Sequence, residues 1–349
     1  MQFDDQTDIY GALKEAGIAL ASALQLSDQA KPAVWLQTGV VGDECEIAIG
    51  ATKLGGCPDL PTGSMWPVRP AYPDAAMRAE GHYKIANSTN VELGGADSPE
   101  QCQLLRAQAL QRAQNIENPF PLHFLAQINF SDIWAAGPVD EDLPRSGVLS
   151  IFYDAVEQPW GYDPQERMGY ALRYHDVPVG QLTRLPMPQP LQDLPEDERL
   201  TALSCELHAC WTPLPPESSD WDKLNLPQTT LDQLFENDWF YEAQGATSDG
   251  DAWTCHHVGG WPTPIQGDMQ IEAALVSAGM FCGDGSAYQD AKLQAVRDTA
   301  PQWLLLAQFG TDEKGGLVWG DLGQVYVWIR RDDLQARRLD NAHLILQCS

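Results

Sequence analysis

The sequence predicts an α+β fold that is rich in β-strands, with mainly antiparallel strands, two pseudo-repeated halves and peripheral helices. Three observations lead to this prediction. Strand-type and helical patterns are interleaved along the chain without the regular alternation of a parallel sheet. No Gly-x-Gly-x-x-Gly run follows a strand pattern, so a dinucleotide-binding fold is not indicated. Two distant segments repeat the same order of loop and strand.

The helical patterns lie outside the strand-rich stretches. Residues 7–26 carry apolar side chains at helical spacing without a proline, which predicts one amphipathic helix. A second helix is expected at 99–116, where Ser98 can cap the first turn and Gln101 can complete a capping box. Three further helical stretches are expected near 230–240, 269–280 and 286–300.

Strand-type runs occupy most of the remaining chain. They are expected at 33–37, 45–50, 122–130, 148–153, 169–174, 303–309, 317–319, 324–330 and 343–347. Prolines crowd the segment 186–227, which predicts a long connection or an excursion at a sheet edge, because proline cannot lie in a central strand. We therefore expect one domain over 1–349, with halves at about 30–185 and 250–349 joined by a Pro-rich, acidic segment, 186–249.

The internal repeat rests on a shared loop motif. Leu54–Gly63 and Val258–Gly267 both read apolar-Gly-Gly-x-Pro-x-x-x-x-Gly. Each is followed later by Leu-Ala-Gln in a strand pattern, at 125–127 and 306–308. This shared order predicts a duplicated unit. Coincidence is the alternative, because glycine and proline are common in loops.

The charge of the chain restricts its partners. The 349 residues carry 49 acidic against 21 basic side chains, a net charge of −28. Such a chain repels phosphate backbones and anionic membrane surfaces, so neither nucleic acid nor membrane is expected as a partner. A basic protein would be attracted, although the charge could also serve solubility alone.

The most acidic broad segment predicts a docking surface. Residues 191–250 contain 13 acidic and 2 basic residues. Four acids there form the candidate acidic interface: Asp220, Asp222, Glu236 and Asp238. Neighbouring aromatic residues could act as anchors inside that surface, or they could belong to the core.

The N-terminus predicts a cytoplasmic location. It has neither the basic start nor the apolar run of a secretory signal, and no stretch of about 18 apolar residues could span a membrane. The eight cysteines are scattered, and we expect them to be reduced thiols.

Several motifs together resemble one known family. Gly55–Pro67 reads Gly-Gly-x-Pro-Asp-Leu-Pro-x-Gly-x-x-Trp-Pro, which resembles the signature of the YwqG-like family of uncharacterised bacterial proteins. Further segments continue the resemblance in the same order: 124–129, 160–164, 256–269 and 318–321. The resemblance extends from about 53 to 348, and the sequence departs from it in the inserts 70–115 and 186–227.

The resemblance implies a β-rich mixed fold but no agreed activity. Members that resemble this sequence are encountered beside polymorphic toxin genes, which suggests an immunity role for some of them. That suggestion is an association and not a physical argument.

Six residues are candidates for ligand binding. In Gln266-Gly267-Asp268 and Trp319-Gly320-Asp321 an acid directly follows a glycine, and pseudo-symmetric halves could bring both motifs to one cleft. The full set is Trp66, His256, Gln266, Asp268, Trp319 and Asp321. The alternatives are that Asp268 caps a helix and that the tryptophans pack in the core.

No metal, cofactor or catalytic site is expected. Cys255-His256-His257 is the strongest metal candidate, but adjacent strand residues point to opposite faces and a fourth ligand is not evident. The chain has neither a Gly-x-Ser-x-Gly elbow nor a phosphate-binding loop, and no sequence motif selects a Cys–His pair.

Two classes of function remain. The first is a non-catalytic interaction protein, such as an immunity protein that neutralises a polymorphic toxin by binding it. The alternative is a small-molecule binding protein or an enzyme that uses a cleft between the two halves. The partner's identity and the oligomeric state stay open.

Overall fold

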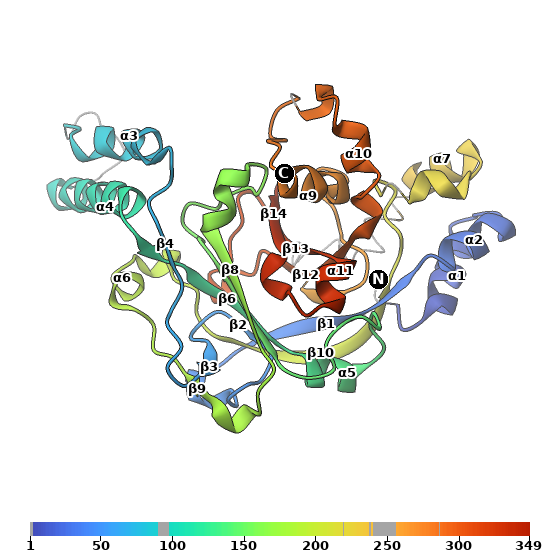
Figure 1. The fold of residues 1–349 in the computed structure, drawn as a ribbon, viewed down its shortest axis with the longest axis horizontal. Coiled ribbons are helices and arrows are strands. Elements are labelled where there is room, and N and C mark those ends of the chain that lie inside the picture. The colour runs from blue at the N-terminus through green and yellow to red at the C-terminus, as the bar shows by residue number, and fades with distance from the viewer. Residues whose placement is uncertain (1–2, 90–97, 219, 237–238, 240–255, 286) are drawn as a thin grey trace.

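One ten-stranded sheet organises the computed structural model of the chain, which describes residues 3–89, 98–218, 220–236, 239, 256–285 and 287–349 (Figure 1). The strand order is β14-β13-β12-β11-β1-β10-β2-β6-β7-β8, and every neighbouring pair is antiparallel. Helices lie around this sheet, as Figure 1 shows. The expected β-rich, antiparallel α+β fold is confirmed.

The strands of the main sheet are β1 (Lys31–Val40), β2 (Lys53–Leu54), β6 (His123–Asn129), β7 (Val148–Tyr153), β8 (Tyr170–His175), β10 (Leu203–Thr212), β11 (His257–Gly259), β12 (Trp303–Gly310), β13 (Gln324–Arg330) and β14 (His343–Gln347). Two small sheets pair β3 (Asp59–Pro61) with β9 (Leu182–Arg184) and β4 (Val68–Arg69) with β5 (Phe120–Pro121). Two expected strands are absent: 45–50 begins as a 3-10 turn capped by Asp43, and 317–319 contributes a single bridge at Leu317.

The centre of the sheet lies where a connection was expected. β10 pairs with β1 along ten residues, and β1 pairs on its other side with β11. The expectation that 186–227 is only a connection or an edge excursion is therefore wrong for its middle part. The reason is the position of the prolines, since the run between Pro195 and Pro213 contains none.

The sheet curls around its largest apolar cluster. Buried side chains from both ends of the strand order belong to this cluster, among them Leu172 on β8 and Leu346 on β14, together with Leu36 on the central strand β1. The rings of Tyr153 and Trp319 meet edge to face at 5.6 Å inside it. The concave side of the sheet is therefore filled by side chains.

The two outer strands of the sheet are connected by the segment 158–163. The backbone N–H of Leu346, in β14, donates to the Trp160 carbonyl at 3.0 Å. His343 bridges the same region, with Nε2 2.8 Å from the Gly161 carbonyl and Nδ1 2.6 Å from the Tyr170 hydroxyl on β8. The sheet is thus closed by this loop and not by a ladder between β8 and β14.

Helices pack on the convex side and at the ends. They are α1 (Gln6–Glu15), α2 (Leu20–Ser27), α3 (Ala75–Ala86), α4 (Pro99–Glu117), α5 (Phe130–Ala136), α6 (Gln189–Gln192), α7 (Gln228–Glu236), α9 (Met269–Ser277), α10 (Leu293–Arg297) and α11 (Arg331–Gln335). The single helix expected at 7–26 is two helices, because Gly17 adopts a φ of +82° between them. The helix and capping box expected from Ser98 and Gln101 are confirmed.

Candidate functional site

Each Gly-Gly loop follows a short strand of the main sheet. Gly55 and Gly56 end β2 with φ values of +60° and +74°, and Gly259 and Gly260 end β11 with +73° and +79°. A Cβ at Gly55 would lie 2.2 Å from the carbonyl oxygen of Thr201. Glycine is therefore required both by the left-handed backbone and by close approach to a neighbouring chain segment.

Both loops are fastened to the next strand in the same way. The Gln127 side-chain oxygen accepts from the Asp59 N–H at 2.8 Å, and that of Gln308 accepts from the Thr263 N–H at 3.0 Å. Asp59 and Thr263 occupy the same place in the loop motif. The duplication of the two halves stays a prediction, which superposition of whole halves would test.

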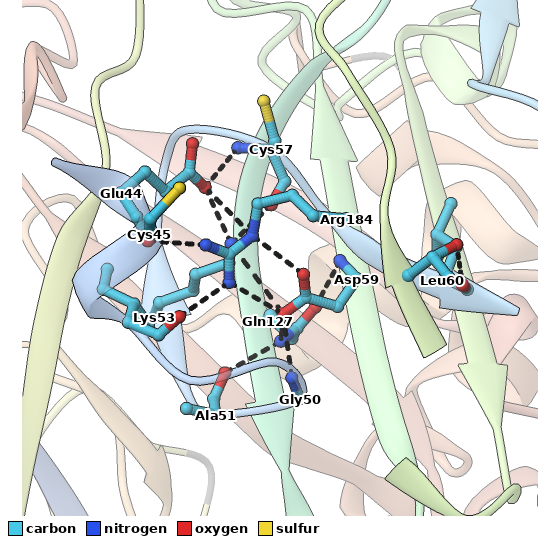
Figure 2. Close-up of polar contacts among 12 residues, drawn as sticks. Glu44, Cys45, Gly50, Ala51, Lys53, Cys57, Asp59, Leu60, Gln127 and Arg184 are labelled. Atoms are coloured by element: carbon cyan, nitrogen blue, oxygen red, sulfur yellow. Dashed lines mark hydrogen bonds and ion pairs between the residues drawn. The ribbon is translucent and has the colours of Figure 1, made fainter. Parts of the chain in front are cut away.

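The first loop sits on a buried ionic network, which Figure 2 shows. We call it the loop network: Glu44, Lys53, Asp59, Gln127 and Arg184. The Lys53 ammonium lies 2.8 Å from a Glu44 carboxylate oxygen and 3.9 Å from Asp59. Asp59 accepts from Arg184 Nε at 2.9 Å and from the Gln127 amide at 3.0 Å. Lys53 and Asp59 have no exposed surface.

The charges of the loop network compensate each other. Burial lowers the pKa of Lys53, and the Glu44 hydrogen bond and the Asp59 charge oppose that shift. Burial also raises the pKa of Asp59, but the Arg184 hydrogen bonds and the Lys53 charge outweigh it and keep this pKa below its usual value. Two cations face two carboxylates, so the network holds the loop and leaves no charge for a ligand.

The second loop sits on a corresponding network without charges. The Gln308 amide donates to the Thr263 hydroxyl at 2.7 Å and to the Gln324 side chain at 2.8 Å. The Tyr326 hydroxyl donates to the Thr263 carbonyl at 2.5 Å. Burial lowers the pKa of His257, the counterpart of Lys53, to about 4. The amide and hydroxyl groups of this second network therefore also satisfy one another.

Three of the predicted binding residues lie around the C-terminus. The Gln266 amide donates to the Cys348 carbonyl at 2.7 Å, and the Asp321 carbonyl accepts from the last N–H of the chain at 3.1 Å. Asp268 caps α9, with its carboxylate accepting from the Gln270 N–H at 2.9 Å. The capping alternative for Asp268 is therefore observed.

The other three predicted binding residues lie elsewhere. Trp319 is fully buried in the core and donates from Nε1 to the Gly310 carbonyl at 3.1 Å. His256 is fully buried, with its Nε2 3.5 Å from an Asp312 carboxylate oxygen. Trp66 is half-buried against the outer face of the sheet. The six residues are thus not gathered in one cleft.

The four predicted interface acids are only partly described. Asp220 is half-buried and forms an ion pair with Lys223. The side chains of Asp222 and Glu236, and the whole of Asp238, lie outside the described residues. Two aromatic residues of the same segment, at 221 and 239, are buried in the apolar cluster of α1, α2 and α7. Those two belong to the core and are not exposed anchors.

Sequence reasoning missed one titratable group near the C-terminus. Burial, reinforced by the Asp268 carboxylate, raises the pKa of Glu272 to about 7. Its Oε2 atom is buried and accepts no hydrogen bond from any described residue. Nearby, the Tyr162 hydroxyl donates to Gln266 at 3.3 Å. Glu272 reads in sequence as an ordinary polar residue of a helix, so no motif could have identified it.

Metal ligands do not gather in the part of the chain that the structure describes. No group of three or more His, Cys, Asp or Glu side chains there could hold an ion. Cys255, from the strongest metal candidate, lies outside the described residues. The seven described cysteines form no disulfide. None of the described helices has the length and apolar character needed to cross a membrane.

The comparison with protein families matches most of the chain. A family described as Domain of unknown function (DUF1963) matches residues 52–348. The match includes both Gly-Gly loops and every strand of the main sheet except β1. No match was found among curated proteins. With more than half of its length matched, the chain belongs to the DUF1963 family.

Proposed function

We propose that this protein is a non-catalytic binding protein for a basic protein, and that it acts as an immunity protein that occupies a polymorphic toxin. The observation that carries the proposal is the net charge of −28. In the described part of the chain, ten basic side chains form ion pairs with carboxylates: Lys53, Arg69, Arg78, Lys84, Arg112, Arg184, Lys223, Arg330, Arg331 and Arg338. The acidic excess therefore stays available to attract a cationic partner.

The filled interior of the sheet supports binding at the surface. A ligand cleft between the two halves would need space where Tyr153 and Trp319 pack together. The charged side chains of the loop network, and the amides and hydroxyls of its uncharged counterpart, are hydrogen-bonded to each other or to the backbone. These observations weigh against the alternative of a small-molecule site or an enzyme cleft between the halves.

The same proposal includes membership of the YwqG-like family and a cytoplasmic location. The motif order from Gly55 to Asp321 supports a YwqG-like member within the DUF1963 family. The toxin as partner rests on the genomic company of similar proteins, and the acidic charge fits a basic toxin domain. Binding in the cytoplasm, before the toxin acts, is the setting that we propose.

The test uses the polymorphic toxin that the proposal requires in the gene beside this one, inactivated at its catalytic residue. Stopped-flow association with the full chain is measured at 50 and 300 mM NaCl. We expect a complex whose association rate falls at least tenfold at the higher salt, because screening shortens the Debye length to below about 8 Å. The absence of a complex, or an association rate that salt does not change, would contradict the proposal.

Charge reversal locates the surface. Lysine at Asp220, Asp222, Glu236 and Asp238 should slow association several-fold and leave the thermal unfolding curve in place. The matched control reverses four exposed acids outside the segment 191–250: Glu15, Glu100, Glu141 and Glu313. If both variants slow association equally, net charge alone steers the partner and these four acids are not the docking surface.

A further inference from the structure

The α3–α4 hairpin forms one wall of an open groove. Figure 1 shows the two helices projecting away from the sheet, next to α6. The groove between this hairpin and residues 193–199 has a volume of about 620 Å³. All but the last two residues of the hairpin lie within 70–115, one of the two segments where the sequence departs from the YwqG-like pattern.

The hairpin wall of the groove carries an exposed apolar strip among polar residues. α4 uses Ala113 and Ile116 to pack against α3. Leu104 and Leu105 line the groove, yet they are 57% and 42% exposed. An apolar strip left open beside a concave surface is typical of a docking site.

The opposite wall is acidic. Asp193, Asp197 and Glu198 line it. The Arg112 guanidinium, which faces them, lies 2.8 Å from Glu198 and 3.5 Å from Glu157, so its charge is compensated. Asp193 and Asp197 form no ion pair with any described residue. Arg199 lines the same wall and forms no ion pair with a described carboxylate, so two unpaired acids lie beside one unpaired cation, and the uncompensated charge beside the apolar strip is negative by one unit.

We propose that this groove binds an amphipathic, basic α-helix of the partner protein. The inference rests on the proposed function and adds to it the place and the chemistry of recognition. Apolar side chains at positions i, i+3, i+4 and i+7 of the bound helix would contact Leu104 and Leu105. Lysine or arginine on the flank of that helix would face Asp193 and Asp197.

The first experiment uses a defined probe and the full chain. An 18-residue peptide with leucine on one helical face and lysine on the flanks is labelled, and its binding is followed by fluorescence anisotropy. A second peptide has glutamate in place of every lysine. We expect the basic peptide to bind at least tenfold more tightly than the acidic one, and its amide-exchange protection to fall on α4 and 193–199.

Matched variants separate the groove from general charge attraction. Leu105→Glu should weaken the basic peptide at least tenfold, whereas Leu20→Glu, at a position 59% exposed on α2, should not. Asp193→Lys with Asp197→Lys should weaken it more than Glu206→Lys with Glu313→Lys, which reverse exposed acids outside the groove. Equal weakening by groove and control variants, or protection located elsewhere, would overturn the inference.

Three further outcomes decide the inference, and the first of them separates it from the proposed function. If the toxin complex forms with a salt-sensitive association rate and Leu105→Glu leaves it unchanged, the groove is wrong and the proposed function stands. If Leu105→Glu instead abolishes a concentration-dependent dimer of the free protein, the groove holds a second copy, and the inference is overturned. Loss of toxin binding with Leu105→Glu, but not with Leu20→Glu, supports it.

Discussion

Replacing Asp59 by alanine should destabilise the fold more than any exposed charge change. Asp59 has no exposed surface and accepts from the Gly50 N–H at 2.8 Å, from Gln127 at 3.0 Å and from Arg184 at 2.9 Å. Without Asp59, Glu44 is the one carboxylate of the loop network that is left to pair with the charges of Lys53 and Arg184. Breaking a buried ion pair on one side costs about 3–5 kcal/mol, and we expect a loss in that range.

The assay is urea unfolding followed by tryptophan fluorescence, since the chain has 12 tryptophans. The control is Asp332→Ala, which removes an exposed pair with Arg330 and should cost less than about 1 kcal/mol. The quadruple variant Asp59→Leu, Lys53→Met, Arg184→Met, Glu44→Gln should recover much of the loss, because it removes all four charges together. An Asp59→Ala variant as stable as the control would refute the view that this network holds the loop.

Three further predictions concern titration and backbone. Burial lowers the pKa of His257 and of His343 to about 4, below the unfolded value of 6.5, so the free energy of unfolding should fall as pH drops from 6.5 to 4. A flat profile there in urea titrations would contradict neutral burial. Burial raises the pKa of Glu272 to about 7, so the buried carboxyl lowers the free energy of unfolding increasingly as pH rises from 4.5 to 7. Urea titrations of Glu272→Gln should therefore show a fold stabilised by about 1–3 kcal/mol at pH 8 and unchanged at pH 4. Gly161→Ala would place a Cβ 1.9 Å from a β14 carbonyl oxygen at a φ of +80°. It should lower the melting temperature far more than Gly180→Ala, where no atom lies within 4 Å of the added Cβ. Equal melting temperatures would show that the loop at Gly161 moves to make room for the methyl group.

The elements that the sequence predicted correctly are those whose stabilising contacts lie within a few residues of each other. Ser98 and Gln101 lie three residues apart, and their capping box could be read directly from the sequence. β10 was missed because its neighbours in the sheet are β1 and β2, which lie far away in the chain. The residues of β10 do alternate between apolar and polar, but the prolines on both sides of the strand favoured a connection instead. Strand order depends on such distant pairings, which no local window contains.

The candidate site was predictable only in part. The glycines of both loops marked positions that require a left-handed backbone, and the structure shows this conformation at Gly55 and Gly259. The ionic network below the first loop was not found, because Asp59 and Arg184 are 125 residues apart. Trp319 and His256 were proposed as ligand contacts, and only the fold reveals that both are fully enclosed.

The position of β1 in the middle of the sheet has a consequence during synthesis. Lys31 and its partner Thr212 are 181 residues apart, so β1 leaves the ribosome long before either neighbouring strand exists. At about 5–20 residues per second, the wait lasts roughly 10–40 seconds. Throughout that time an apolar strand with two unpaired edges is exposed, which is the condition that invites aggregation and chaperone binding. The nascent chain, more than the finished protein, is therefore the form that needs protection.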